Sequence, residues 1–237
     1  MSDYSGIDKN ALPKHIALIV DGNRRWAKER GLPGISGHKA GAENINKLVK
    51  TAKEMGIKCI SAWVFSTENW KRSKEEVKYL FELMGDTVQD YRNKFLEEKS
   101  RFVHIGRKDR IPGKLRDSII NLEEQTKNFD DFTVCLAIDY GGHDELVRTI
   151  NHLKDSGIEI NEENIEKNLD TAKLPKIDLI IRTGGEVRLS GFMSWQCAYA
   201  ELFFTKTHFP DFSPEELKKA VEDFSQRERR FGGDSKK

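Results

Sequence analysis

The sequence predicts a single α/β domain with a central, mostly parallel sheet of six strands flanked by helices. Two observations predict this fold. Short apolar segments alternate with longer helical patterns along the chain, an order typical of a parallel sheet covered by helices. Several apolar segments are continuous runs of Ile, Val, Leu and Phe, as expected of strands buried on both faces. The length of 237 residues is one that a single α/β domain commonly reaches.

The expected strands are short apolar runs, and they cover residues 15–20, 57–65, 102–105, 132–138, 177–181 and 201–204. The expected helices lie between and after them, at residues 37–55, 73–99, 112–127, 143–156, 161–169 and 214–227. The domain is predicted to span residues 12–233, and residues 1–11 and 234–237 are expected to be flexible ends.

The helix at residues 73–99 has the clearest signals. Ser73 is its predicted N-cap, and Glu76 is predicted to reach back to it in a capping box. Apolar residues then recur at intervals of three or four from Val77 to Phe95 and form one continuous stripe. Core packing alone would account for such a stripe. Residues 213–216 give a second start signal, with Pro214 at the first helical position.

Charge and cysteine content limit the possible partners and compartments. Lys and Arg number 40 against 39 Asp and Glu, so the net charge is +1. The two signs are intermixed, and no nucleic-acid partner is expected. Three cysteines without a Cys-x-x-Cys pair suit a reducing compartment. The N-terminus lacks a signal-peptide pattern, and the longest apolar run, residues 16–20, is far shorter than the roughly 20 residues of a membrane span. We therefore expect a cytoplasmic protein whose membrane contact, if it has any, is peripheral.

A polar segment follows the first predicted strand, where the chain reads Val-Asp-Gly-Asn-Arg-Arg-Trp at residues 20–26. In open α/β sheets ligands bind at the carboxyl ends of the strands, and a helix start after a glycine turn presents N–H groups to an anion. The Asp21 carboxylate could hold Mg²⁺ beside a bound diphosphate. The alternative is that Asp21 caps a helix and that Arg24 and Arg25 are surface charges.

Two further loops carry polar groups. Residues 65–72 read Phe-Ser-Thr-Glu-Asn-Trp-Lys-Arg at the end of the second predicted strand, where an ordinary capped loop is equally plausible. Residues 182–190 place Arg182, Arg188 and Ser190 around a Gly-Gly turn, and arginine forks match phosphate oxygens well. Nucleotide-binding glycine loops and a His-Glu-x-x-His motif are absent from the sequence. The residues themselves thus indicate a Mg²⁺-assisted diphosphate site and no particular reaction.

Taken together, these segments resemble the cis-prenyltransferase family, whose bacterial members make undecaprenyl diphosphate. The matching stretches lie within residues 12–233 and occur in the family's order and spacing. They are HIALIVDGNRRWA, GHKAG, FSTENWKRS, DYGG, IRTGGEVRLS, WQCAYAELFF, FPDF and RERRFGG. The resemblance implies condensation of isopentenyl diphosphate with an allylic diphosphate, expected to be farnesyl diphosphate. The expected product is a Z-polyprenyl diphosphate, undecaprenyl diphosphate, for synthesis of the cell-wall lipid carrier.

The resemblance also implies roles by position. Asp21 and Asn69 would be catalytic, and Asp21 and Glu201 would be linked to Mg²⁺. The implied substrate-binding residues are Gly22, Asn23, Arg24, Arg25, Trp26, His38, Ser66, Thr67, Glu68, Trp70, Arg72, Arg182, Arg188, Ser190, Arg230 and Gly232. Arg230 and Gly232 belong to a C-terminal motif that enters the partner subunit's active site in the family, so a homodimer is implied. The growing chain would occupy a hydrophobic tunnel between helices and sheet, with part of the stripe on residues 73–99, Val64 and Phe132 as candidate wall positions.

Three positions depart from the family pattern. Gly34 stands where members commonly have arginine, Arg24 replaces a glycine that is frequent in bacterial members, and Gly191 replaces the usual asparagine. These departures leave the product length and the contacts to the allylic diphosphate open. A short or irregular branched product is one alternative, and a non-catalytic accessory subunit is another, although such subunits typically lose the catalytic aspartate. A diphosphate hydrolase is a further alternative, but no activated nucleophile stands out.

Overall fold

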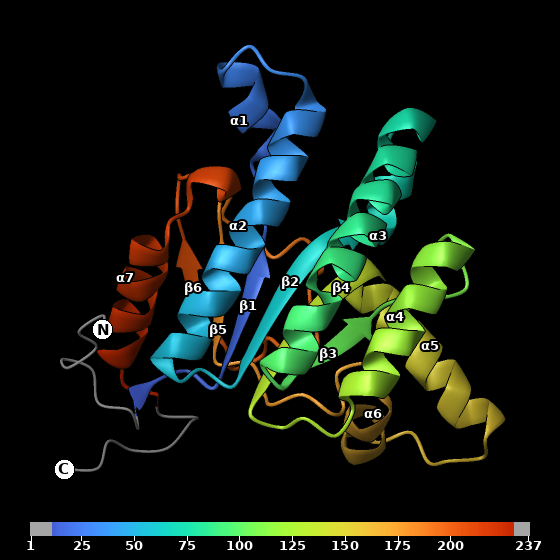
Figure 1. The fold of residues 1–237 in the computed structure, drawn as a ribbon. Helices are drawn as coiled ribbons and strands as arrows, with labels where there is room; N and C mark the ends of the chain where they lie inside the picture. Colours follow the sequence, from blue (N-terminus) through green and yellow to red (C-terminus); the bar gives the residue numbers. More distant parts are fainter. Residues whose placement is uncertain (1–10, 230–237) are drawn as a thin grey trace.

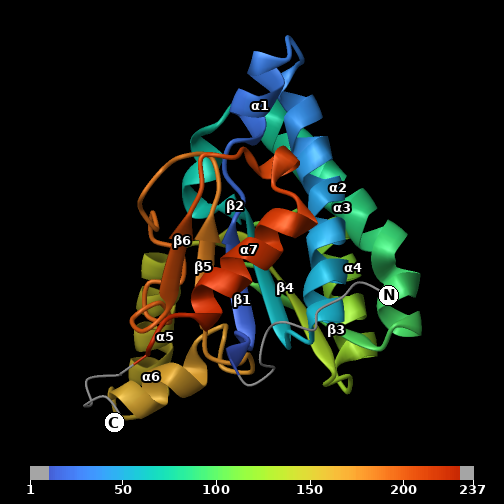
Figure 2. The same cartoon turned by 90° about the vertical axis from the view of Figure 1, so that its left-hand side faces the viewer.

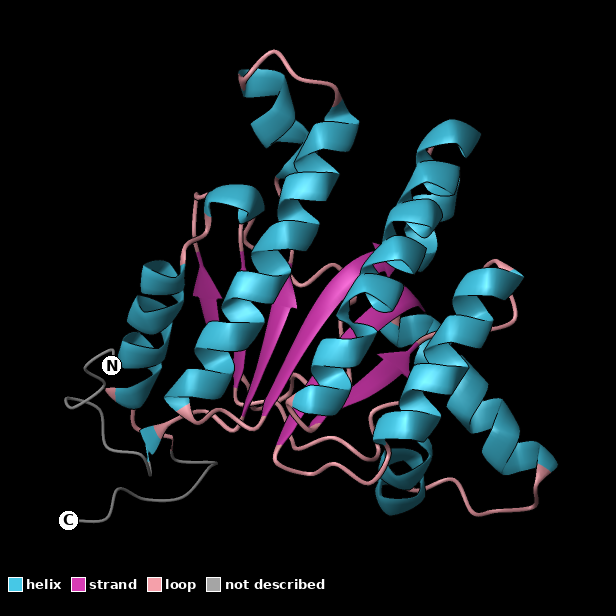
Figure 3. Ribbon diagram, in the orientation of Figure 1, coloured by secondary structure: helices cyan, strands magenta, loops and turns pink. Residues whose placement is uncertain are grey.

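A six-stranded sheet runs through the protein in the strand order β3-β4-β2-β1-β5-β6, as the computed structural model shows for residues 11–229 (Figure 1). Every neighbouring pair is parallel. The strands are β1 His15–Ile19, β2 Cys59–Ser66, β3 Ser100–Ile105, β4 Phe132–Tyr140, β5 Leu179–Arg182 and β6 Glu201–Phe204. All six predicted strands are confirmed, and the strand arrows point toward the same edge of the sheet (Figure 3).

Helices cover both faces of this sheet. They are α1 Asn23–Glu29, α2 Gly34–Met55, α3 Lys74–Glu97, α4 Gly113–Thr126, α5 Gly142–Asp155, α6 Glu162–Asn168 and α7 Pro214–Ser225. Helices α2, α3, α4 and α7 lie over one face, and α5 and α6 lie on the opposite side (Figures 1 and 2). Two short 3-10 helices, η2 Thr67–Lys71 and η3 Phe209–Asp211, follow β2 and β6.

Burial on both faces explains the continuous apolar runs. Successive residues of β1 alternate between two hydrophobic clusters. Ile16 and Leu18 pack on the side of α2 and α7, whereas Ala17 and Ile19 pack on the opposite side against Phe192. Because both faces are covered, the strand has no polar side to show in the sequence.

The two predicted helix starts differ in the use of their capping glutamate. At α7, which begins at Pro214 as predicted, a capping box forms, since Glu216 Oε2 accepts a hydrogen bond from Ser213 N at 3.0 Å. At α3 the Ser73 hydroxyl accepts from Glu76 N at 3.2 Å, but the Glu76 carboxylate turns to Arg72 Nη1 instead, at 3.1 Å. The predicted return of Glu76 to the cap is therefore wrong, because an ion pair competes for the same carboxylate.

Cys59 and Cys135 are buried in strands, and all three cysteines are free. Within residues 11–229, no helix has the length and apolar character needed to cross a membrane. The expected flexible ends lie outside the described residues, apart from residue 11, and so do Arg230 and Gly232.

Candidate active site

Asp21 stands just beyond the carboxyl end of β1, at the centre of a cluster of hydrogen bonds. Its Oδ1 accepts from Gly22 N at 2.6 Å and from Arg25 Nη2 at 3.0 Å. Its Oδ2 accepts from Arg182 Nη2 at 3.0 Å. The turn requires glycine at position 22, where φ is 101° and a Cβ would stand 2.6 Å from His208 Nδ1.

The carboxyl of Asp21 is held in its charged form. Burial alone would raise its pKa, but the hydrogen bond from Arg182 and the charge of Arg25 outweigh burial and lower the pKa below its usual value. The site therefore offers a permanent carboxylate among guanidinium groups at neutral pH.

The loop after β5 brings the predicted second group of residues to the same place. Thr183 Oγ1 donates to the carbonyl of Asp21 at 2.7 Å. Arg182 Nη1 donates to the carbonyl of Arg188 and to Ser190 Oγ, the latter at 2.9 Å. Residues 161 positions apart thus meet, because β1 and β5 are neighbouring parallel strands.

A polar cleft opens beside this cluster, and its charge is mostly positive. Its lining residues are Val20, Asp21, Gly22, Asn23, Arg24, Arg25, Lys28, Gly31, Leu32, Gly34, His38 and Arg72. Asp21 is the one carboxylate among them, against four Lys or Arg side chains. Such a lining suits an anion of several charges, because a compact set of guanidinium groups matches phosphate oxygens.

Glu76 reaches the same cluster from the first turn of α3. Its Oε1 lies 3.1 Å from Arg72 Nη1 and 3.4 Å from His38 Nε2, and its Oε2 lies 3.9 Å from Arg24 Nη1. This carboxylate does not stand out in the sequence, because its position in a capping motif accounts for a glutamate there. Burial, together with the charges of Arg72 and Arg24, lowers the pKa of His38 although Glu76 acts in the opposite direction.

The loop after β2 is fixed by contacts within the protein. Asn69 Oδ1 accepts from Ser66 N at 3.1 Å. The indole of Trp70 donates to Asp139 Oδ1 at 2.8 Å, and Asp139, fully buried with φ 52°, also accepts two hydrogen bonds from Arg110. The Trp70 N–H is therefore engaged by the protein, which the sequence did not indicate. Thr67 is half-buried beside Gly141, while Glu68 is exposed.

Trp26 and Glu201 lie apart from the cluster. Trp26 Nε1 donates to Asp211 Oδ1 at 2.7 Å, and Arg30 lies over its ring, so Trp26 faces the η3 segment and does not line the cleft. Glu201 begins β6 beside Leu179, the first residue of β5, and pairs with Arg227 at 2.8 Å. Within one chain it stands at the amino-terminal edge of the sheet, opposite Asp21. Its implied link to the metal stays a prediction.

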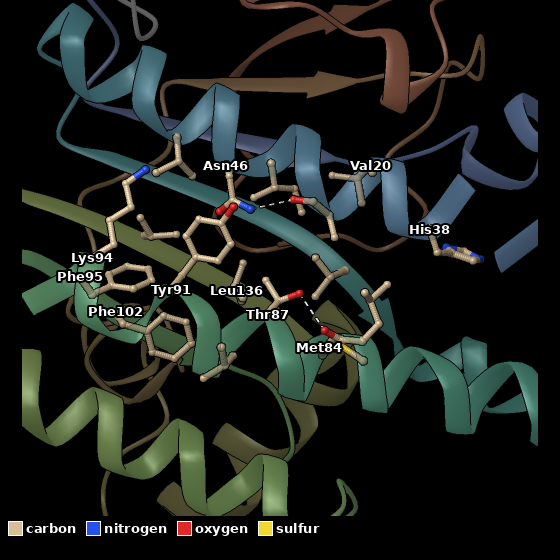
Figure 4. A pocket seen from close by; sticks show the side chains of 18 of the residues that line it. Val20, His38, Asn46, Met84, Thr87, Tyr91, Lys94, Phe95, Phe102 and Leu136 are labelled. Carbon is tan, nitrogen blue, oxygen red and sulfur yellow. Dashed lines mark hydrogen bonds between the residues drawn. The ribbon is translucent and has the colours of Figure 1, made fainter. Parts of the chain in front are cut away.

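An apolar pocket lies between α2, α3 and the sheet, next to the polar cleft (Figure 4). Its walls include Ile45 and Val49 of α2, Leu83 and Met84 of α3, and Leu136 of β4. In the close view His38 lies at one end and Lys94 and Phe95 at the other.

The two predicted wall positions differ in outcome. Val64 lines the pocket as predicted. Phe132 does not; its side chain belongs to the hydrophobic core cluster beside α2 and α7, and Lys53 lies over its ring.

The polar cleft and the apolar pocket share three lining residues, Val20, Asn23 and His38. A single ligand can therefore extend from one into the other. A ligand that fills both would carry an anionic head and a hydrocarbon chain, as a prenyl diphosphate does.

The chain belongs to the isoprenyl transferase family, since the family model described as "Putative undecaprenyl diphosphate synthase" matches residues 19–232. The isoprenyl transferase of Thermotoga maritima is 45% identical over 227 residues, covering 94% of this chain and 97% of that protein. The isoprenyl transferase of Treponema denticola is 44% identical over 220 residues, covering 92% and 97%.

Two solved structures show the same fold. Lavandulyl diphosphate synthase from Lavandula x intermedia, crystallised with dimethylallyl diphosphate, matches with a TM-score of 0.89 at 35% identity, covering 94% of this chain and 99% of that one. A probable undecaprenyl diphosphate synthase from Campylobacter jejuni matches with a TM-score of 0.79 at 38% identity, covering 93% and 98%. These similarities confirm the predicted family and fold.

Proposed function

We propose that this transferase condenses isopentenyl diphosphate with an allylic diphosphate, farnesyl diphosphate, and repeats the step to make undecaprenyl diphosphate. The observation that carries the proposal is the junction at Val20, Asn23 and His38, where the basic cleft passes into the apolar pocket. An allylic diphosphate fits it with its anionic head in the cleft and its hydrocarbon tail between α2 and α3.

In each step the allylic C–O bond breaks and inorganic diphosphate leaves. A C–C bond forms between the allylic C1 and C4 of isopentenyl diphosphate, and a proton is lost from C2 of the latter. Arg24, Arg25 and Arg72 would bind the allylic diphosphate and stabilise the charge that develops on it. Arg182, Arg188 and Ser190 would bind isopentenyl diphosphate. Asn69, with its oxygen held by Ser66 N, would take part in proton removal, as the resemblance implies.

The donor set suits Mg²⁺. The described residues contain no group of three or more metal-ligating side chains, whereas Asp21 offers one charged carboxylate next to the anion site. Mg²⁺ is commonly bound by one or two carboxylates together with substrate phosphates. When bound at Asp21, the ion would neutralise diphosphate charge.

We also propose that the enzyme acts as a homodimer in which Arg230 and Gly232 complete the partner's site. The support is the match of the C-terminal sequence to the family motif. A hydrocarbon product of this size would bring the enzyme into peripheral contact with a membrane.

The similarity to lavandulyl diphosphate synthase supports a second candidate, a short or irregular branched product. One assay separates the two. The protein is incubated with labelled isopentenyl diphosphate and either farnesyl or dimethylallyl diphosphate, with and without Mg²⁺, and the products are sized. Products of about eleven isoprene units support the first proposal, C10 products support the second, and no incorporation with either substrate contradicts both.

A further inference from the structure

We propose that Glu76 is an internal counter-anion of the basic cleft, which the incoming allylic diphosphate displaces. The inference rests on the proposed function, because it concerns the ligand of the same cleft. Its consequence is that Glu76 lowers the apparent affinity for diphosphate, although it lies among residues that would bind it.

The contacts of Glu76 carry the first step. One carboxylate lies within 4 Å of three nitrogen-bearing groups, those of Arg72, His38 and Arg24, at 3.1, 3.4 and 3.9 Å. The exposed fraction of the Glu76 side chain is 20%, and those of Arg72 and His38 are 27% and 11%. All three partners line the polar cleft. Glu76 therefore occupies guanidinium groups, those of Arg72 and Arg24, that a bound anion would use.

Helix architecture does not require this arrangement. Ser73 caps α3 through the Glu76 backbone N–H, and that contact needs no carboxylate. At α7 the same Ser-x-x-Glu pattern sends the Glu216 carboxylate back to Ser213 N. The Glu76 side chain forgoes that hydrogen bond and pairs with the basic cluster, so the electrostatics of the cleft decide its position.

Displacement of Glu76 would also affect the apolar pocket, because Glu76 lies on the helix that forms one of its walls. The next turns of α3 carry Leu80, Leu83 and Met84, which line the apolar pocket. Glu76 Oε1 lies 3.4 Å from Nε2 of His38 on α2, the opposite wall of that pocket, so the start of α3 and α2 meet at Glu76. A diphosphate that takes over Arg72 and Arg24 would release this contact at the end where the tail enters.

Calorimetric titration with inorganic diphosphate tests the inference on the full chain. The variants are Glu76→Gln and, as a matched control on the same helical turn, Glu75→Gln, since Glu75 is exposed. Removal of a competing anion should tighten diphosphate binding by roughly three- to tenfold, the scale of a partly exposed ion pair. The KM for the allylic diphosphate should fall by a similar factor while the KM for isopentenyl diphosphate is unchanged. Glu75→Gln should behave as the native protein.

Unchanged or weaker diphosphate binding by a folded Glu76→Gln protein would overturn the inference, since a residue with a purely structural or binding role would not compete. Should that variant fail to fold, Glu76→Asp replaces it. Its shorter side chain cannot reach all three groups, so a smaller tightening is expected, and none would overturn the inference. If the native protein and every variant bind no diphosphate, the proposed function fails as well.

Discussion

Arg182 Nη2 and Asp21 Oδ2 lie 3.0 Å apart and join the end of β5 to the end of β1. Arg182 is nearly buried, with 6% of its side chain exposed, whereas 31% of the Asp21 side chain is exposed. The guanidinium thus binds the carboxylate from the protein interior and leaves it accessible from the cleft. Under the proposed function, a metal ion and two diphosphates would meet at this pair.

We therefore expect Asp21→Ala to abolish turnover while the fold remains. Loss of a metal-anchoring carboxylate should cost several kcal/mol at the transition state, a rate reduction of roughly a thousandfold or more. Asp21→Asn, which keeps a hydrogen-bond acceptor for Arg182, should be almost as inactive and closer to native in stability. Steady-state kinetics and circular dichroism check this, and normal turnover by either folded variant would rule out the role of Asp21.

The sequence was sufficient to predict the strands and the main cluster, for a physical reason. Strands buried on both faces leave continuous apolar runs, and their carboxyl ends must meet at one edge of a parallel sheet. Asp21 and Arg182 could therefore be placed together. The pattern could not show where long side chains point, because their partners come from distant segments. The Trp26 indole is oriented by a hydrogen bond to Asp211, 185 positions away, and the Trp70 indole by one to Asp139, 69 positions away.

Glu76 shows the same limit within a local motif. Ser73 and Glu76 have the spacing of a capping box, and a local reading assigns both side chains to the helix start. Arg72 is only four residues from Glu76, but the presence of His38 and Arg24 beside Glu76 depends on how α2 and α1 pack against α3. Only the tertiary structure could reveal which of the two competing interactions prevails.

Enlarging a side chain in the middle of the apolar pocket should shorten the product. Leu136 lines the pocket from β4, between His38 and Lys94 in the close view (Figure 4). Leu136→Trp would occupy volume that the growing chain needs, so we expect shorter polyprenyl diphosphates at a similar initial rate. Ile120→Trp, on the exposed side of α4, is the control. Chromatographic sizing of the products distinguishes the two variants. An unchanged distribution of product lengths in Leu136→Trp would mean that the growing hydrocarbon chain does not pass Leu136.

The proposed dimer predicts a shared active site. Deletion of residues 230–237 keeps the ion pair between Arg229 and Asp178 and should sharply reduce activity while the dimer persists. A mixed dimer is then made from one Asp21→Ala chain and one shortened chain, each with its own affinity tag. If each site takes the tail of the partner, one site carries both defects and the other none. About half of the native activity should remain, whereas tails acting within their own chain would leave almost none.

His15 should make folding stability depend on pH. Its Nδ1 lies 2.8 Å from the carbonyl of Pro175, so it donates there, and Nε2 accepts from the Ser61 hydroxyl at 2.6 Å. Burial lowers its pKa to about 4. As pH falls below about 6.5, the unfolded chain binds a proton at this histidine before the folded chain does, so stability is lost, by roughly 2 kcal/mol at pH 5.

The variant His15→Gln removes this group, and stability should then fall less between pH 7 and pH 5. The buried His104, with a pKa also lowered to about 4, remains in both proteins and contributes equally. Urea unfolding at the two pH values measures the difference. Equal losses in the native protein and the variant would show that His15 does not contribute.

Arg24 lies beside Gly34, where a Cβ would stand 3.8 Å from the Arg24 Cγ. Both residues line the polar cleft. We infer that Arg24 supplies part of the positive charge that an arginine at position 34 supplies in the family. A charge-assisted hydrogen bond is worth about 1.5–3 kcal/mol, roughly 10- to 150-fold in affinity or rate.

Three variants test this compensation. Arg24→Gly should lower kcat/KM for the allylic diphosphate by at least about tenfold. Gly34→Arg alone should have little effect because Arg24 already serves this part of the cleft, and a Cβ at position 34 would meet the Arg24 side chain only in ordinary van der Waals contact. In the double variant the new arginine should recover much of the loss, and a double-mutant cycle then gives a coupling energy that differs from zero. Strictly additive effects, or an Arg24→Gly enzyme as active as the native one, would mean that the two positions act independently and that the cleft binds its anion without Arg24.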